Sequence, residues 1–168
     1  MSETTGIIFQ EIQHARQVWL FLLVFGIAGL IWVFAFFQLI LGRPVGTRPA
    51  PNGVLIIIFI AVGILLPAAF LTNTLKTTVK EEGIYFSYFP FIMKERFIPR
   101  DEIEGYSAVK YNPLKEYGGF GVRFGAKAKA YNASGDKGVM IEVADRKDIL
   151  LGSQKAEELE AAIDKIMQ

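Results

Sequence analysis

The chain has 168 residues, of which 52% are hydrophobic, and its mean hydropathy is +0.33. Soluble domains usually contain about 45–50% apolar residues, so part of this chain is expected to lie in lipid. The 18 lysines and arginines nearly balance the 17 aspartates and glutamates. Because nucleic-acid-binding proteins usually carry a strong basic excess, no nucleic-acid partner is expected. Cysteine is absent, which excludes disulfides, thiolate nucleophiles and sulfur-ligated metals.

Residues 1–17 precede the first apolar run and are interpreted as an N-terminal tail. This segment contains His14, the only histidine of the chain. A zinc site needs several nitrogen or sulfur ligands, and neither cysteine nor a second histidine is present. No metal site is therefore expected, and His14 is interpreted as a surface or interfacial residue.

Two apolar runs follow, at residues 18–41 and 54–71. The first has no charged residue, and a helix rising about 1.5 Å per residue over this length exceeds a hydrocarbon core of about 30 Å. The second only just spans such a core, and Pro67 is expected to kink its last turn. A buried helix of a soluble protein is the alternative for the second run. The closeness of the two runs favours a transmembrane helical hairpin over residues 18–71.

The connection between the runs, residues 42–53, is rich in proline and glycine, which suits a short link between antiparallel helices. Both termini are then expected on one side of the membrane. Arg43 and Arg48 lie in the connection, whereas three basic residues flank the runs on the terminal side: Arg16, Lys76 and Lys80. The positive-inside rule favours, on this small difference, a multi-pass protein of the cytoplasmic (inner) membrane with both termini in the cytoplasm.

Few polar side chains occur within the two runs. Gln38 is the only strongly polar one, and it is predicted to pair the helices or to lie at an interface rather than to line a permeation path. Trp19, near one end of the first run, suits the aromatic belt of a membrane interface. Trp32 falls in the middle of the run and is interpreted as a packing residue.

After Leu71 the hydrophobic pattern takes the alternation of β-strands. The expected strands cover residues 75–80, 84–89, 94–99, 104–111, 121–125, 129–133, 139–144 and 148–151. An amphipathic helix is expected at residues 154–167, with Ser153 as its N-cap and an apolar stripe formed by Leu159, Ala162, Ile163 and Ile166. Residues 72–168 therefore predict a β-barrel or sandwich closed by one helix.

The order of several motifs carries a resemblance: "VKEEGIYFSYFPF", "FIPRDEI", "KEYGGFGVRFG", "AYNASGDKGVMIEV" and "ILLGSQKAEELEAAI". Over residues 18–167 the chain resembles small prokaryotic membrane proteins in which a two-helix hairpin precedes a pleckstrin-homology-like (bacterial PH) domain. The resemblance implies a mainly-β PH-like barrel capped by a C-terminal α-helix, usually at the cytoplasmic face. It implies no catalytic residues.

The glycine-rich stretch at residues 116–125 could be mistaken for a nucleotide-binding loop. A dinucleotide fingerprint has the spacing G-x-G-x-x-G and opens a helix, whereas Gly119, Gly121 and Gly125 leave Phe124 at the third glycine position. Strand alternation continues after them, so these glycines are interpreted as bends of a small sheet. No cofactor is expected.

Two further groups of charged residues are candidates for chemistry. Arg123, Lys127 and Lys129 are expected to share one strand face, where they form either a solvated surface or a contact for an anion or lipid headgroup. The carboxylates of "RDEIE", residues 100–104, lie at a predicted turn and are interpreted as solvated charges. No catalytic constellation emerges, and the protein is expected not to be an enzyme.

The turn "FPFIM", Phe89–Met93, is expected to lie close to the bilayer, because the preceding strand pair leaves the membrane and returns toward it. Phe89, Phe91 and Ile92 are thus candidate membrane-interface residues, together with Trp19. The alternative is that their side chains fold back into the barrel core.

These observations predict a non-enzymatic, membrane-anchored PH-like module that serves as a protein-interaction or assembly subunit. Its expected partners are the lipid bilayer and a protein whose identity the sequence does not give, and self-association is left open. The alternative function is a sensor of anionic lipid headgroups that uses Arg123, Lys127 and Lys129.

Overall fold

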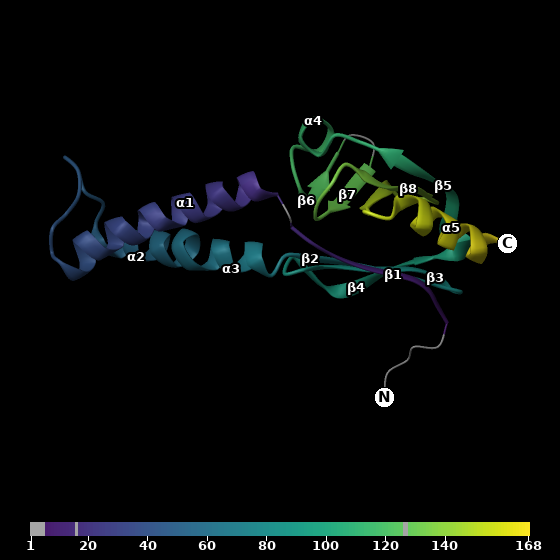
Figure 1. Cartoon of the computed structure of the whole chain (residues 1–168). Helices are drawn as coiled ribbons and strands as arrows, with labels where there is room; N and C mark the ends of the chain where they lie inside the picture. The colour runs from purple at the N-terminus through teal and green to yellow at the C-terminus, as the bar shows by residue number, and fades with distance from the viewer. Residues whose placement is uncertain (1–5, 16, 126–127) are drawn as a thin grey trace. The chain divides into compact units, whose positions relative to one another are not determined.

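A computed structural model describes residues 6–15, 17–125 and 128–168 (Figure 1). The chain divides into two compact units. The helical unit comprises residues 17–72, and the β-rich unit combines the segment before residue 17 with residues 73–168.

The helical unit consists of two continuous apolar helices. The first contains α1 (Val18–Ala35) and the π-helical segment η1 (Phe36–Ile40). The second contains α2 (Asn52–Ile58), the π-helical segment η2 (Phe59–Leu65) and α3 (Leu66–Leu71). At 23 and 20 residues, both helices are long enough and apolar enough to cross a membrane. The two expected helical runs are confirmed.

Pro67 has a specific role in the contact between these helices. Proline has no N–H, so the carbonyl of Gly63, four residues earlier, lacks its regular α-helical donor. The indole N–H of Trp32 donates to this carbonyl at 2.9 Å. The site is closely packed, since a β-carbon at Gly63 would lie 3.3 Å from the Phe59 ring and 3.4 Å from the indole nitrogen. Trp32 therefore packs between the helices as expected. Its indole N–H also replaces the backbone donor that Pro67 lacks.

Gln38 links the ends of the same two helices that lie next to the connection between them. Its Nε2 donates to the Ala50 carbonyl at 2.6 Å and to Asn52 Oδ1 at 2.9 Å. The prediction that Gln38 is a donor between the two helical segments is confirmed.

The first sheet of the β-rich unit contains four antiparallel strands: β1 (Ile7–His14), β2 (Thr74–Lys80), β3 (Gly83–Phe89) and β4 (Ile92–Pro99), in that order. The expectation of a tail over residues 1–17 is wrong, because β1 lies within it and pairs with β2 along its length. Phe9 and Gln13 are buried on one face of β1. The polar Glu11 and Gln13 on this inward face hide the alternation in the sequence.

The second sheet contains five strands: β5 (Ile103–Lys110), β6 (Gly121–Phe124), β7 (Ala128–Asn132), β8 (Lys137–Val143) and β9 (Asp148–Gly152). Their order is β5-β8-β9-β7-β6. The β7–β9 pair is parallel and the other pairs are antiparallel. A 3-10 turn, η3 (Arg100–Glu102), precedes β5, and a short helix, α4 (Pro113–Tyr117), follows it.

Of the two expected arrangements, the barrel is wrong and the sandwich agrees better, because the strands of the described residues form two separate sheets that share one core. The turn η3 separates β4 from β5, and these two strands do not pair. The parallel β7–β9 pair also interrupts a simple up-and-down order, since β8 pairs with β5 and β9 instead of β7.

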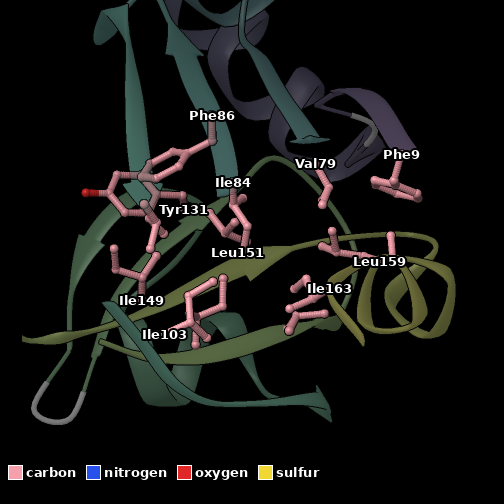
Figure 2. Packing of buried hydrophobic residues seen from close by; sticks show 14 of the residues in the cluster. Phe9, Val79, Ile84, Phe86, Ile103, Tyr131, Ile149, Leu151, Leu159 and Ile163 are labelled. Carbon is pink, nitrogen blue, oxygen red and sulfur yellow. The ribbon is translucent and has the colours of Figure 1, made fainter. Parts of the chain in front are cut away.

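Both sheets and the C-terminal helix α5 (Ala156–Met167) contribute to one core (Figure 2). Figure 2 shows side chains of the first sheet, such as Phe86 and Val79, pointing toward Tyr131 and Leu159. The four residues expected to form the apolar stripe of the helix are all buried: Leu159, Ala162, Ile163 and Ile166. The expected amphipathic helix is thus confirmed, and it packs against strands of both sheets.

Candidate functional site

One end of the four-stranded sheet carries both links to the helical unit. We call it the junction end, defined by the row of paired residues His14, Thr74 and Phe89. His14 Nδ1 and Thr74 Oγ1 are 3.1 Å apart across β1 and β2. Because Phe89 is the last residue of β3, the β3–β4 turn lies at the junction end as well.

The β3–β4 turn exposes large apolar side chains. The exposed fractions are 44% for Phe89, 65% for Phe91 and 75% for Met93. Ile92, in contrast, is partly buried and packs against the core. Of the candidate membrane-interface residues in this turn, Phe89 and Phe91 therefore project into solvent, and only Ile92 folds back as the alternative expected.

The remaining candidate interface residue, Trp19, belongs to the helical unit. It is the second residue of α1, and its side chain is half exposed. A tryptophan at the start of an apolar helix suits a membrane interface.

The opposite end of the same sheet is acidic. The β2–β3 turn contains Glu81 and Glu82, and Tyr85 donates its hydroxyl to Glu82 Oε1 at 3.1 Å. The backbone N–H of Arg100 donates to the Glu82 carbonyl at 3.1 Å, which brings η3 to this turn. The carboxylates expected to be solvated at residues 100–104 lie here, and Glu102 forms an exposed ion pair with Arg146.

The glycine-rich stretch ends a helix instead of beginning one. Gly118 closes α4 in the left-handed conformation, with φ 69°. Gly119 and Gly121 also have positive φ values, which favour glycine, and β6 starts at Gly121. The prediction that these glycines are bends leading into strands is confirmed.

The candidate anion contacts do not all share one face. Lys129 pairs with Phe124, and its Nζ lies 5.4 Å from the centroid of that ring. Arg123, the neighbour of Phe124, pairs with the buried Ala130 and so points to the other face of the β6–β7 hairpin. Arg123 Nε donates to the Phe120 carbonyl at 2.9 Å. Lys127 lies outside the described residues.

The expectation of a shared face is thus wrong for Arg123 and Lys129. The even spacing of these residues suggested a common face, but the register across the hairpin pairs each even-numbered position with an odd-numbered one. Alternation shows which residues of one strand share a face. The register between two strands of a hairpin depends instead on the length and type of the turn that joins them.

A buried polar seam joins the two sheets, and sequence reasoning missed it. Gln13 Nε2 donates to the Gly152 carbonyl at 2.6 Å, and the Tyr88 hydroxyl donates to the Asn132 carbonyl at 3.1 Å. Glu11 accepts hydrogen bonds from Ser153 Oγ at 2.6 Å and from the Gln154 backbone N–H at 3.0 Å. The sequence feature that could have indicated this seam is the occurrence of isolated polar residues within apolar strands.

Burial changes the acidity of two tyrosines, Tyr88 of the seam and Tyr111 of a separate buried cluster with Ala130 and Leu150. Desolvation raises the pKa of Tyr88 to about 12, although a hydrogen bond with Asn73 and the charge of Arg123 oppose the rise. Desolvation likewise raises the pKa of Tyr111 to about 12, opposed by the neighbouring Asn132 side chain. Burial therefore favours the protonated form of both hydroxyls, and the Tyr88 hydroxyl donates to the Asn132 carbonyl.

The predicted helix cap at Ser153 takes a different form. Ser153 Oγ accepts the Lys155 backbone N–H at 3.0 Å, while Glu11 of β1 accepts the N–H of Gln154. The N-cap position itself is occupied by Lys155. A carboxylate from the other end of the chain thus satisfies a donor just ahead of α5. Among the described residues, no group of histidine and acidic side chains has the arrangement of a metal site.

Comparison with protein-family models identifies residues 1–167 as a match to a family of unknown function, DUF6141, and the chain belongs to this family. Searches of the curated proteins and of the solved structures found no match.

Proposed function

We propose that this member of DUF6141 is a non-enzymatic, membrane-anchored module that presents its β-rich unit to a protein partner at the cytoplasmic membrane. The observation that carries the proposal is the pairing of β1 with β2. One strand precedes the first apolar helix and the other follows the second, yet His14 and Thr74 are neighbours. Two membrane crossings would return the chain to its starting side, as this pairing requires.

The surface proposed for the protein partner is the outer face of the four-stranded sheet. Phe97 is 38% exposed and stacks on Tyr85 with ring centroids 4.5 Å apart. Lys80 Nζ lies 5.0 Å from the centroid of the Tyr85 ring. Ile12, on β1, is 55% exposed on the same face. Aromatic groups beside a cation and an exposed aliphatic residue are typical of protein-binding surfaces.

The PH-like character of the unit is part of the proposal. A four-stranded antiparallel sheet, a second sheet and a closing C-terminal helix support it. The absence of catalysis is also proposed. It is supported by the glycine-rich stretch, which forms a helix end and a strand instead of a phosphate loop, and by the ion pairing of Glu102 with Arg146.

Site-specific photocrosslinking in native membranes tests the function. A photoreactive amino acid at Phe97 should form an adduct with a second polypeptide, whereas the same group at Lys165, which is exposed on α5, should not. The substitution Ile12→Asp should reduce the Phe97 adduct, because a charge then enters the binding face. Equal adducts from both positions, or adducts that Ile12→Asp leaves unchanged, would contradict the proposed face.

Recognition of anionic headgroups is the second candidate function. It is favoured by Phe124, 75% exposed, which lies beside Lys129 as an apolar and cationic pair. The separation of Arg123 onto the other face weakens it. Phosphatidylglycerol retained by the purified protein should decrease in Lys129→Glu if this function is correct, and should stay constant if it is not.

A further inference from the structure

We propose that the β3–β4 turn, Phe89–Met93, is a second membrane contact, whose aromatic and methionine side chains enter the interfacial layer of the leaflet next to the ends of the two helices. The proposal rests on the membrane anchoring proposed above. It goes further by naming the surface of the β-rich unit that meets lipid. The occupant is a lipid surface and not a protein.

The first argument is the shortness of the chain between α3 and β2. Only Thr72 and Asn73 separate Leu71 from Thr74, so the α-carbons of Leu71 and Thr74 are at most about 11 Å apart. Thr74 pairs with Phe89, and paired residues of antiparallel strands lie about 5 Å apart. The turn is thus tethered close to the point where the second helix would leave the hydrocarbon core.

The link between β1 and α1 restricts the sheet further. His14, the last residue of β1, also pairs with Thr74, and the chain reaches Val18 through a short connection. Two short connections from adjacent strands limit how far the junction end can tilt or move away from a bilayer. An interfacial layer is about 5–8 Å thick on each side of the core, and the short tether permits a turn at this end to enter it.

The second argument is the chemistry of the turn. Phe91 and Met93 are among the most exposed large apolar side chains of the β-rich unit, at 65% and 75%. A cluster of such side chains on one turn is unfavourable in water and favourable at the boundary of headgroups and acyl chains. Lys94, which follows the turn and is exposed, suits an anionic leaflet.

The third argument is the polarity of the sheet along its strands. The β2–β3 turn at the opposite end carries Glu81 and Glu82, both exposed. An anionic leaflet repels the acidic turn and the interfacial layer accommodates the apolar turn, so charge and hydrophobicity favour the same orientation.

The test uses the full chain in phosphatidylcholine vesicles that contain phosphatidylglycerol. Because the protein has no cysteine, single cysteines can be introduced by Phe91→Cys, Glu81→Cys and Leu30→Cys and labelled with an environment-sensitive fluorophore. Leu30 is 60% exposed in α1 and reports on the span itself. Emission is then quenched by lipids carrying spin labels near the headgroup or near the bilayer centre.

We expect the probe at residue 91 to be quenched severalfold more than the probe at residue 81, and more by the shallow than by the deep spin label. Equal, weak quenching at 91 and 81, with strong deep quenching at 30, would overturn the turn contact and leave the anchoring intact. Blue-shifted emission at 91 without lipid quenching would also overturn it, because protein would then cover the turn. Loss of quenching at residue 30 would instead refute the anchoring.

Discussion

At the scale of single residues, we expect Tyr88 and Tyr111 to make the β-rich unit sensitive to alkaline pH. Burial raises both pKa values to about 12. An unfolded tyrosine has a pKa of about 10, so the stabilisation is complete below pH 10 and is lost as the pH rises toward 12. Ionisation of each tyrosine then lowers the free energy of unfolding by up to about 3 kcal/mol, since one pKa unit corresponds to about 1.4 kcal/mol.

Thermal unfolding of the detergent-solubilised protein between pH 9 and 12 measures this effect. We expect the wild-type midpoint to decrease steeply above pH 10, and Tyr88→Phe to make the decrease shallower. Tyr85→Phe is the matched control, because Tyr85 lies on the outer face of the same strand and is less buried. Identical slopes for the wild type and Tyr88→Phe would show that Tyr88 does not titrate with unfolding.

The residue-scale features were the hardest to predict from the sequence. Gln38 was predicted correctly because a strongly polar group in an apolar helix has few options besides pairing. Gln13 gave no comparable signal, because its Nε2 donates to the Gly152 carbonyl, which only the packing of the two sheets brings near. Asn132 Oδ1 accepts the Gly121 N–H within the β6–β7 hairpin, whose register the sequence did not reveal. The face of Lys129 depended on a hairpin register that alternation alone does not determine.

At the scale of elements, Trp32 and Pro67 couple the two apolar helices through the Gly63 carbonyl. A double-mutant cycle tests this coupling. Trp32→Phe should destabilise the helical unit by about 0.5–2 kcal/mol, the range for a hydrogen bond between membrane helices. In the Pro67→Ala background the cost should be smaller, because residue 67 then offers an N–H to the same carbonyl.

Unfolding in mixed detergent micelles, followed by circular dichroism, provides the free energies for the cycle. Leu30→Ala serves as the control, since Leu30 is exposed on α1 and should be additive with Pro67→Ala. Additive effects for Trp32→Phe and Pro67→Ala would argue against the shared carbonyl.

Elements with a strong hydrophobic periodicity were predicted from the sequence, whereas helix α4 and strand β1 lack such a periodicity and were missed. Strands β2 to β9 and helix α5 follow alternation or a helical stripe. The short helix α4 has signals that could have revealed it. Asn112 caps it through the Leu114 and Lys115 N–H groups, Pro113 occupies its first turn, and Gly118 ends it. Strand β1 depends on a partner sixty residues away, which no local pattern indicates.

At the scale of the whole molecule, the charges near the helix ends predict a cytoplasmic β-rich unit. Asp136, which is exposed in the β7–β8 turn, is a suitable reporter because the chain has no cysteine. We expect Asp136→Cys to react with a membrane-impermeant thiol reagent only after cells are permeabilised. Arg48→Cys, in the connection between the helices, is the opposite control and should react in intact cells.

Reaction of Asp136→Cys in intact cells, with protection of Arg48→Cys, would reverse the orientation. Reaction of both positions from outside would conflict with the two-span arrangement itself. The apolar composition predicted association with lipid, and the excess of three basic residues over two predicted the side of the membrane.

The pairing of β1 with β2 also sets an order of events during synthesis. β1 leaves the ribosome first, but its partner follows only after both apolar helices, and His14 and Thr74 are 60 positions apart. At about 5–20 residues per second, β1 waits roughly 3–12 s for β2. Until then Phe9 has no sheet to cover it. Closure of the first sheet therefore requires that both apolar helices have been translated, so the pairing of β1 with β2 can only follow synthesis of the whole helical unit.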